Sequence, residues 1–296
     1  MNGKNIIWMI KKKREMKLKY STPNKLKSTV DVDVQRLKQI VEELSFERVY
    51  GNPGNEVAAE VVKKYFTDIG GEITEDAERN ILLGNLDANI LIGAHYDSVP
   101  GSPGADDNAS AVAVMLETAR ILSGKNVLFA AWNGEEFGLR GSRFFVSKSG
   151  SPVKFKQVHI LEMVGYTDKS PNSQKSPIPM METPTVGDFL GVVGNKKELV
   201  NKIINTAKSV SIPVVGMNLP EGLSFHMIEQ VSPHLLRSDH APFWEEGVPA
   251  VMWTDTSEFR NPNYHKFTDT PDTLDYEFMA EVVKLLVEVV NGSSII

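Results

Sequence analysis

Residues 89–110 read NILIGAHYDSVPGSPGADDNAS, in which a short apolar run is followed by polar residues and then by a helical pattern. Continuous apolar runs of this length are typical of parallel β-strands that are covered on both faces. Similar runs recur at residues 126–132, 158–164 and 248–254, and helical patterns occupy residues 108–122, 139–146, 196–210 and 274–290. We therefore expect a three-layer α/β/α sandwich around a mixed, mainly parallel central sheet.

Two further helices are expected ahead of the first of these strands. Asp31 is a candidate N-cap for the first helix, and Asn55 for the second, which Gly70-Gly71 would end. Residues 167–194 are rich in Ser, Pro and Asn, so we expect a long surface loop near the mouth of a functional site.

The charge of the chain is unevenly distributed. Residues 1–28 hold nine Lys/Arg and one Glu, so the rest of a chain with net charge -6 carries -14. An acidic body argues against a nucleic-acid-binding surface. We expect residues 1–28 to form a basic, disordered extension and residues 29–296 to form a single catalytic domain.

The sequence contains no cysteine, so disulfides, thiolate metal sites and cysteine nucleophiles are excluded. A metal would have to be bound through His, Asp and Glu. The apolar run at residues 6–10 is shorter than the roughly 7–15 residues of a signal-peptide core, and basic residues follow it directly. No later run reaches the roughly 18 apolar residues of a membrane span, so we expect a cytoplasmic protein without membrane partners.

Polar residues follow the first predicted strand at the position where parallel sheets bind their ligands. His95 is a candidate metal ligand, and Asp97 is close enough in sequence to hold its other ring nitrogen. Asp106 and Asp107 open the next helix, where they are good capping residues, but one carboxylate there can also bridge two metal ions. We favour Asp107 as the bridge.

Two adjacent glutamates, Glu135 and Glu136, follow the second strand and lie between glycines. Neighbouring carboxylates can divide the work, because one binds metal while the other remains free as a general base. Glu162 lies inside an apolar strand, which is costly unless the charge is paired or bound to metal. A buried salt bridge is the competing interpretation. His265, in a loop before the last helix, is the second imidazole candidate.

These residues together form a set suited to two metal ions. His95 and Glu162 would bind one ion, Glu136 and His265 the other, and Asp107 both. Mixed nitrogen and oxygen ligation suits zinc, with cobalt or manganese as substitutes. Such a site polarises a carbonyl and lowers the pKa of water.

Six segments, in this order, resemble the zinc aminopeptidases of the aminopeptidase S and Y type: GAHYDS, GADDNAS, NGEEFGLRGS, LEMVGY, SDHAPFW and YHKFTDTPDTL. The resemblance runs from about residue 36 to residue 290. It implies the zinc-peptidase form of the fold, two zinc ions per chain and peptide substrates. It also implies Asp107 as the bridge, Glu135 as the general base and Glu136 as a ligand, with Glu162 where many members carry Asp.

The leading hypothesis is an aminopeptidase in which Tyr264, next to His265, donates to the tetrahedral oxyanion. Glutaminyl cyclases, relatives that use one zinc, are an alternative, although the full ligand set and NGEEFG favour the peptidase. A carboxypeptidase is a further alternative, with Arg260 binding the substrate carboxylate, unless Arg260 forms a surface salt bridge instead. A binding protein that kept the fold would be expected to lose ligands, and none is missing. His240 also matches the family, and we expect it to pack and to support the site.

Overall fold

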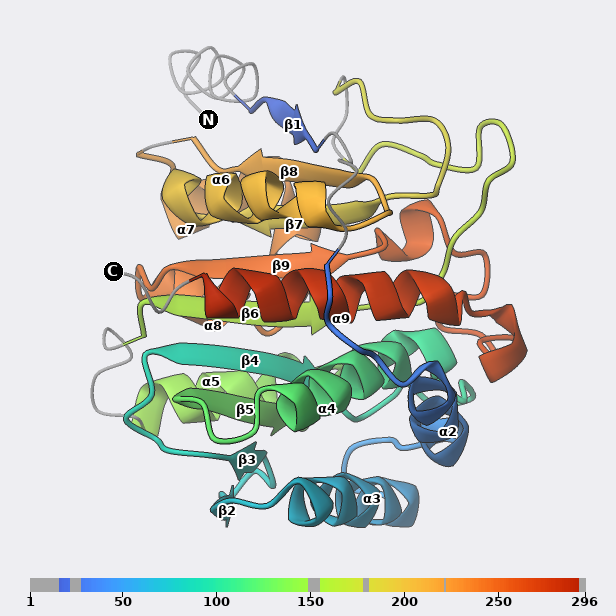
Figure 1. Ribbon diagram of the computed structural model, residues 1–296, viewed down its shortest axis with the longest axis vertical. Helices are drawn as coiled ribbons and strands as arrows, with labels where there is room; N and C mark the ends of the chain where they lie inside the picture. The colour runs from blue at the N-terminus through green and yellow to red at the C-terminus, as the bar shows by residue number, and fades with distance from the viewer. Residues whose placement is uncertain (1–15, 22–27, 149–154, 178–180, 221, 293–296) are drawn as a thin grey trace.

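The structure, a computed structural model, describes residues 16–21, 28–148, 155–177, 181–220 and 222–292. Within these residues the chain forms a mixed nine-stranded sheet in the order β1-β8-β7-β9-β6-β4-β5-β3-β2, with helices on both faces (Figure 1). The predicted three-layer α/β/α sandwich is confirmed.

The four strands predicted from apolar runs lie side by side at the centre of the sheet. They are β4 (Ile90–His95), β5 (Val127–Trp132), β6 (Gln157–Glu162) and β9 (Ala250–Thr254), and each pairs in parallel with its neighbour. Their side chains are almost entirely buried, as expected for strands covered on both faces. Parallel pairing brings the carboxyl ends of these strands to one edge of the sheet.

Five outer strands complete the sheet: β1 (Leu18–Tyr20), β2 (Ile73–Glu75), β3 (Ile81–Leu83), β7 (Leu190–Gly194) and β8 (Val214–Asn218). Four of the pairings that add them are antiparallel, and only β7 and β8 pair in parallel. Strand β7 lies within residues 167–194, so the expectation of an uninterrupted loop there is wrong at its last five residues.

Five helices cover one face of the sheet: α2 (Val34–Leu44), α3 (Pro53–Ile69), α4 (Ala111–Ile121), α6 (Lys197–Thr206) and α9 (Tyr276–Asn291). Helices α5 (Arg140–Lys148), α7 (Phe225–Val231) and α8 (Ala241–Glu245) cover the other face. Each face of the sheet has its own buried apolar cluster. Removing this apolar surface from water is the main force that holds the three layers together.

The two N-terminal helices begin at other residues than the sequence predicted. Asp33, not Asp31, caps α2, because its carboxylate accepts the backbone N–H of Arg36 at 3.0 Å. Asn52 precedes α3, whose first residue is Pro53, a residue suited to the first helical turn. Asn55 is therefore inside the helix and buried, and it donates to the Asn133 side chain at 2.8 Å.

Part of the basic N-terminal stretch belongs to the sheet. Leu18–Tyr20 pairs with β8 as the edge strand β1, and Met16 is buried, so these residues differ from the disordered extension expected over 1–28. The rest of that stretch, at 1–15 and 22–27, lies outside the described residues. Among the helices that the structure describes, none is both long and apolar enough to cross a bilayer.

Candidate metal centre

Two groups of potential metal ligands meet beyond the carboxyl ends of the central strands. The first group is His95 from β4, Asp107 and Glu162 from β6, and the second is Asp107, Glu136 and His265. Within each group the ligand atoms lie within 4.8 Å of one another. The structure therefore brings together all five residues that the sequence proposed as ligands.

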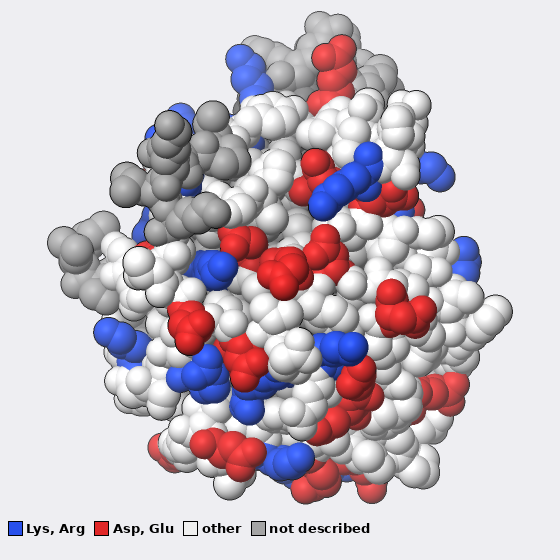
Figure 2. Space-filling model, turned by 45° about the vertical axis from the view of Figure 1, so that its right-hand side comes forward, with Lys and Arg blue, Asp and Glu red and all other residues white. Residues whose placement is uncertain are grey.

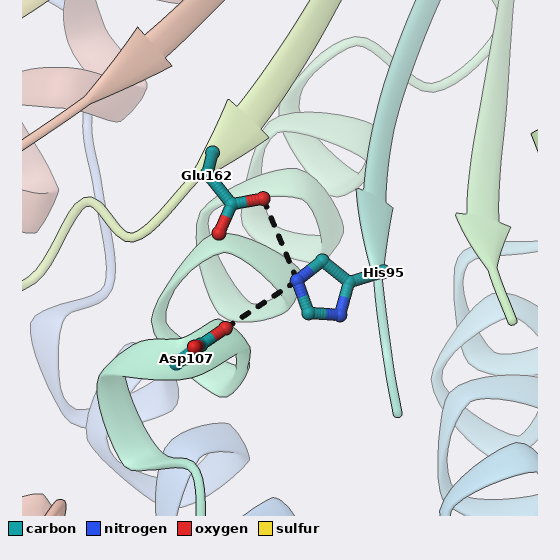
Figure 3. Close-up of side chains that lie close together, drawn as sticks. All are labelled: His95, Asp107 and Glu162. Carbon is teal, nitrogen blue, oxygen red and sulfur yellow. Dashed lines mark ion pairs between the residues drawn. The ribbon is translucent and has the colours of Figure 1, made fainter. Parts of the chain in front are cut away.

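Glu162 and Asp107 approach the His95 ring from different elements (Figure 3). The Nε2 atom of His95 is 3.5 Å from Oε2 of Glu162 and 3.4 Å from Oδ1 of Asp107. All three side chains are at most 9% exposed. One point of space is thus surrounded by an imidazole nitrogen and two carboxylate oxygens.

The second group lies closer to solvent. The Nε2 atom of His265 is 3.0 Å from Oδ2 of Asp107 and 3.3 Å from Oε1 of Glu136, and its side chain is 34% exposed. His265 has a left-handed backbone conformation, with φ of 58°. Such conformations are uncommon for residues other than glycine and are concentrated at functional sites.

Asp107 is the residue that belongs to both groups. Its Oδ1 atom faces His95 and its Oδ2 atom faces His265. The neighbouring Asp106 is occupied elsewhere, because its carboxylate accepts the Gly165 N–H at 3.0 Å and the Asn261 amide at 2.6 Å. The geometry thus favours Asp107 over Asp106 as the shared carboxylate.

Two further carboxylates hold the ligands in position. Asp97 lies 3.4 Å from Nδ1 of His95, and its two oxygens accept the backbone N–H groups of Glu135 and Glu136 at 3.1 and 3.2 Å. The Asp269 carboxylate likewise accepts the N–H groups of Asp106 and Asp107 at 2.9 and 3.1 Å. Carboxylates of this kind orient metal-binding histidines and loops.

Sequence reasoning missed two residues that support the site. Ser238 donates from Oγ to Oε2 of Glu162 at 2.7 Å. Arg48 is fully buried and donates to the carbonyls of Tyr96, Pro103 and Gly104, in the segment between His95 and Asp107. The SDH segment was a signal for Ser238, whereas nothing near Arg48 in the sequence indicates that its side chain is buried.

The two adjacent glutamates of the centre are costly to ionise without a cation. Burial raises the pKa of Glu135 well above its ordinary value and that of Glu136 to about 7. Burial lowers the pKa of His95, but the negative charges of Glu162 and Glu135 raise it by more, so the net shift is upward. Burial also lowers the pKa of His265, but the carboxylates of Asp107 and Glu136, 3.0 and 3.3 Å from its Nε2 atom, raise that pKa to about 10.

The donor atoms fit divalent metal ions. Nε2 of His95, Oδ1 of Asp107 and Oε1 of Glu136 are buried and have no hydrogen-bond partner in the part of the chain that the structure describes. Buried polar atoms are almost always paired, and unpaired atoms that lie within a group of potential ligands are those that a metal ion would satisfy. The nitrogen and oxygen donors suit zinc, cobalt or manganese.

Glu135 and Tyr264 face the centre without belonging to either group of ligands. Oε2 of Glu135 lies 3.9 Å from Nε2 of His95, and the Glu135 side chain is 11% exposed. The Tyr264 ring stacks on His265 with 3.7 Å between ring centroids. Burial raises the pKa of Tyr264, so that its phenol keeps its proton at neutral pH.

Arg260 and His240, which the sequence also singled out, are buried and hydrogen-bonded within the fold. Arg260 is 5% exposed, donates to Gln174 and Tyr166, and lies over the Phe189 ring, so it forms no surface salt bridge. His240 is buried, and its Nε2 atom lies 2.8 Å from the Leu235 carbonyl. Burial lowers the pKa of His240 to about 4, in keeping with a neutral packing residue.

The comparisons with known proteins agree with this geometry. Residues 80–290 match Peptidase family M28. Protein YfbL of Escherichia coli (strain K12), which is uncharacterized, is 34% identical over 80% of this chain and 80% of its own. Aminopeptidase YwaD of Bacillus subtilis (strain 168) is 30% identical over 67% of this chain but only 39% of its own length.

Solved structures share the fold. The LapA aminopeptidase of Legionella pneumophila superposes with a TM-score of 0.65 at 22% identity, covering 87% of this chain and 71% of LapA. A zinc aminopeptidase of Bacillus subtilis gives 0.50 at 25% identity, covering 72% and 50%. The glutaminyl cyclase of Porphyromonas gingivalis gives 0.64 at 15% identity, covering 88% and 99%. Because the family match spans more than half of the sequence, the chain belongs to Peptidase family M28, a family of zinc metallopeptidases.

Proposed function

We propose that the chain is a zinc-dependent aminopeptidase that removes N-terminal residues from peptides. The observation that carries the proposal is the position of Asp107, whose two oxygens face His95 and His265 separately. One carboxylate thereby joins two sets of ligands, as expected for a two-metal centre. Relatives named as aminopeptidases, among them YwaD and the zinc enzyme of Bacillus subtilis, support the same class of reaction.

His95, Asp107 and Glu162 would hold one zinc ion, and Asp107, Glu136 and His265 the other. When bound, the two ions supply Lewis-acid polarisation of the scissile carbonyl and a lowered pKa for water. Asp97 keeps the His95 ring oriented, because it faces the nitrogen that is not used for metal.

Glu135 is the proposed general base. It lies beside the ligands but outside both groups. Among the described side chains that can carry a positive charge, His95 is the one paired with its carboxylate. It would accept a proton from the attacking water and pass it to the nitrogen of the leaving amine. Tyr264 keeps its proton and stacks on His265, and it would donate to the developing oxyanion.

The contacts of Arg260 argue against a carboxypeptidase. This arginine was the candidate for binding a substrate carboxylate, but it is buried and donates to Gln174 and Tyr166. A glutaminyl cyclase remains the second candidate, since such an enzyme shares the fold. The second group of ligands, with Glu136 and His265, favours the peptidase.

A panel of matched peptides tests the proposal. The zinc-loaded protein is incubated with one peptide in free, N-acetylated and C-terminally amidated forms, and with a homologue that begins with Gln. We expect sequential loss of N-terminal residues from the free and amidated peptides, and none from the acetylated form. Protection by amidation would indicate a carboxypeptidase. Loss of ammonia from the Gln peptide without shortening would indicate a cyclase, and either result would overturn the proposal.

A further inference from the structure

An apolar cavity of about 110 Å³ adjoins the metal centre. Glu162 and Tyr264 line it at the end that faces the ligands. Its floor is formed by the neighbouring strands β9, β7 and β8, with side chains such as Met252, Val193 and Met217. The cavity thus runs from the reaction centre across the sheet toward the edge formed by β1.

Leu18 of β1 lines the same cavity at its far end, where it lies opposite Met217 in the sheet register. Strand β1 is four strands away from β6, which carries Glu162 (Figure 1). At about 4.8 Å between neighbouring strands, the backbones of Glu162 and Leu18 are roughly 19 Å apart. Leu18 precedes the residues matched to Peptidase family M28, which begin at residue 80.

We propose that Leu18 of β1 is the specificity-determining end wall of this cavity, so that it limits the length of the N-terminal side chain that the cavity accepts. The inference rests on the proposed aminopeptidase activity, because an α-amine at the metal centre directs the adjacent side chain into this cavity. Short side chains leave the far part of the apolar lining unused, whereas long ones bury more surface against it.

A series of substrates with side chains of increasing length tests how far the cavity extends from the metal centre. Aminoacyl amides with one leaving group and unbranched side chains of two to about eight carbons give a profile of kcat/KM against length. Each added methylene that is buried should raise kcat/KM by about fourfold, from about 0.8 kcal/mol per methylene. The rise should continue beyond four carbons and end where the chain meets Leu18. An optimum at two or three carbons would overturn the inference.

Variants at Leu18 identify the end wall. Leu18→Ala should move the optimum to side chains longer by one or two methylenes, and Leu18→Phe should move it to shorter ones. Lys19→Ala is the matched control, because Lys19 is on the same strand but contacts Asn201 of α6 on the other face of the sheet. Equal shifts for Lys19→Ala, or no shift for both Leu18 variants, would overturn the role of Leu18.

A binding measurement separates this inference from the proposed reaction. Free amino acids of the same series, added to the zinc-loaded protein, should raise the melting temperature most at the length that is optimal for turnover. If no substrate is cleaved but this profile still depends on Leu18, the proposed reaction fails and the pocket stands. If substrates are cleaved with a profile that is insensitive to Leu18, the reaction stands and the inference fails.

Discussion

Glu135 and Glu136 are neighbours in the chain, yet their carboxylates have different surroundings. Glu136 contributes Oε1 to a group with Asp107 and His265, whereas Glu135 belongs to neither group. Asp97 accepts both of their backbone N–H groups and so fixes the turn that separates the two side chains. The chemical roles of the pair are therefore open to a direct test.

Glu135→Gln keeps the size of the side chain and removes its basic oxygen. If Glu135 is the general base, the variant should bind zinc normally while kcat falls by roughly 10²–10⁴-fold. KM should change little, because the lost interaction acts mainly in the transition state. Steady-state kinetics and metal analysis of the same preparation measure both quantities.

Glu136→Gln provides the contrast at the adjacent position. It weakens a ligand, so zinc content should fall, and added zinc should restore part of the rate. Loss of metal in Glu135→Gln with normal metal content in Glu136→Gln would mean that the two roles are reversed. Unchanged turnover in both variants would exclude this mechanism.

Asp107→Ala should remove metal from both positions, since Asp107 is the residue shared by the two groups. Activity should be abolished, and elemental analysis after reloading with zinc should find little bound metal. Asp106→Asn is a suitable comparison, because Asp106 accepts hydrogen bonds from Gly165 and Asn261 and belongs to neither group. A variant without Asp107 that still held two ions would show that another residue is the bridge.

The central strands could be predicted from their apolar runs, whereas the short strands at the edges of the sheet could not. Strands β4, β5, β6 and β9 each have five or six residues, and the ligands His95 and Glu162 are the last residues of β4 and β6. Strands β1, β2 and β3 have three residues each, which is too short to show a periodicity. Strand β1 also lies in a basic stretch whose composition favours disorder, and its place depends on pairing with β8, almost 200 residues later.

Arg48 links the elements that carry the ligands. It follows α2, and its guanidinium donates to the carbonyls of Tyr96, Pro103 and Gly104 between β4 and Asp107. Arg48→Met should leave the buried carbonyls of Tyr96 and Pro103 without this donor, at about 1–3 kcal/mol for each unsatisfied group. The Gly104 carbonyl would keep the N–H of Ala109 as a donor. We therefore expect a loss of about 3 kcal/mol or more in the free energy of unfolding in urea, together with weaker zinc binding.

Arg143→Met is the control for the loss of a guanidinium. Arg143 pairs with Glu245 at the surface, with both side chains about half exposed. Pairs of this kind contribute little to stability, so the urea midpoint of this variant should remain near that of the unchanged protein. Equal effects for the two variants would show that Arg48 does not support the loops in the way its contacts suggest.

Charged side chains of both signs lie on the surface of the protein, whereas the acidic side chains that matter for function are buried together. Acidic and basic side chains are interspersed on the face seen in Figure 2, and no continuous basic field is visible among its described residues. The buried acids instead gather around His95 and His265, where Asp97, Asp107, Glu135, Glu136 and Glu162 meet. Their residue types and order were visible in the sequence, but their distances depend on how the sheet brings distant segments together.

Zinc binding should therefore displace protons from the folded protein. Without metal, the pKa of His265 is raised to about 10, so its ring holds a proton at pH 7, and the pKa of His95 is also raised well above its ordinary value. The folded pKa of His265 exceeds the unfolded value of about 6.5, so its ion pairs stabilise the metal-free protein fully below that pH. This contribution is lost as the pH rises through about 10.

A zinc ion needs unprotonated rings and ionised carboxylates, so filling both positions should release protons, among them that of His265, and zinc should bind more tightly as the pH rises. Calorimetric titration at pH 7 in two buffers of different ionisation enthalpy measures the protons, and elemental analysis counts the ions. We expect about two zinc ions per chain and a higher melting temperature, since a ligand at a thousand times its Kd adds about 4 kcal/mol of stability. Saturation at one tightly bound ion would contradict the shared role of Asp107 and favour the single-zinc chemistry of a cyclase.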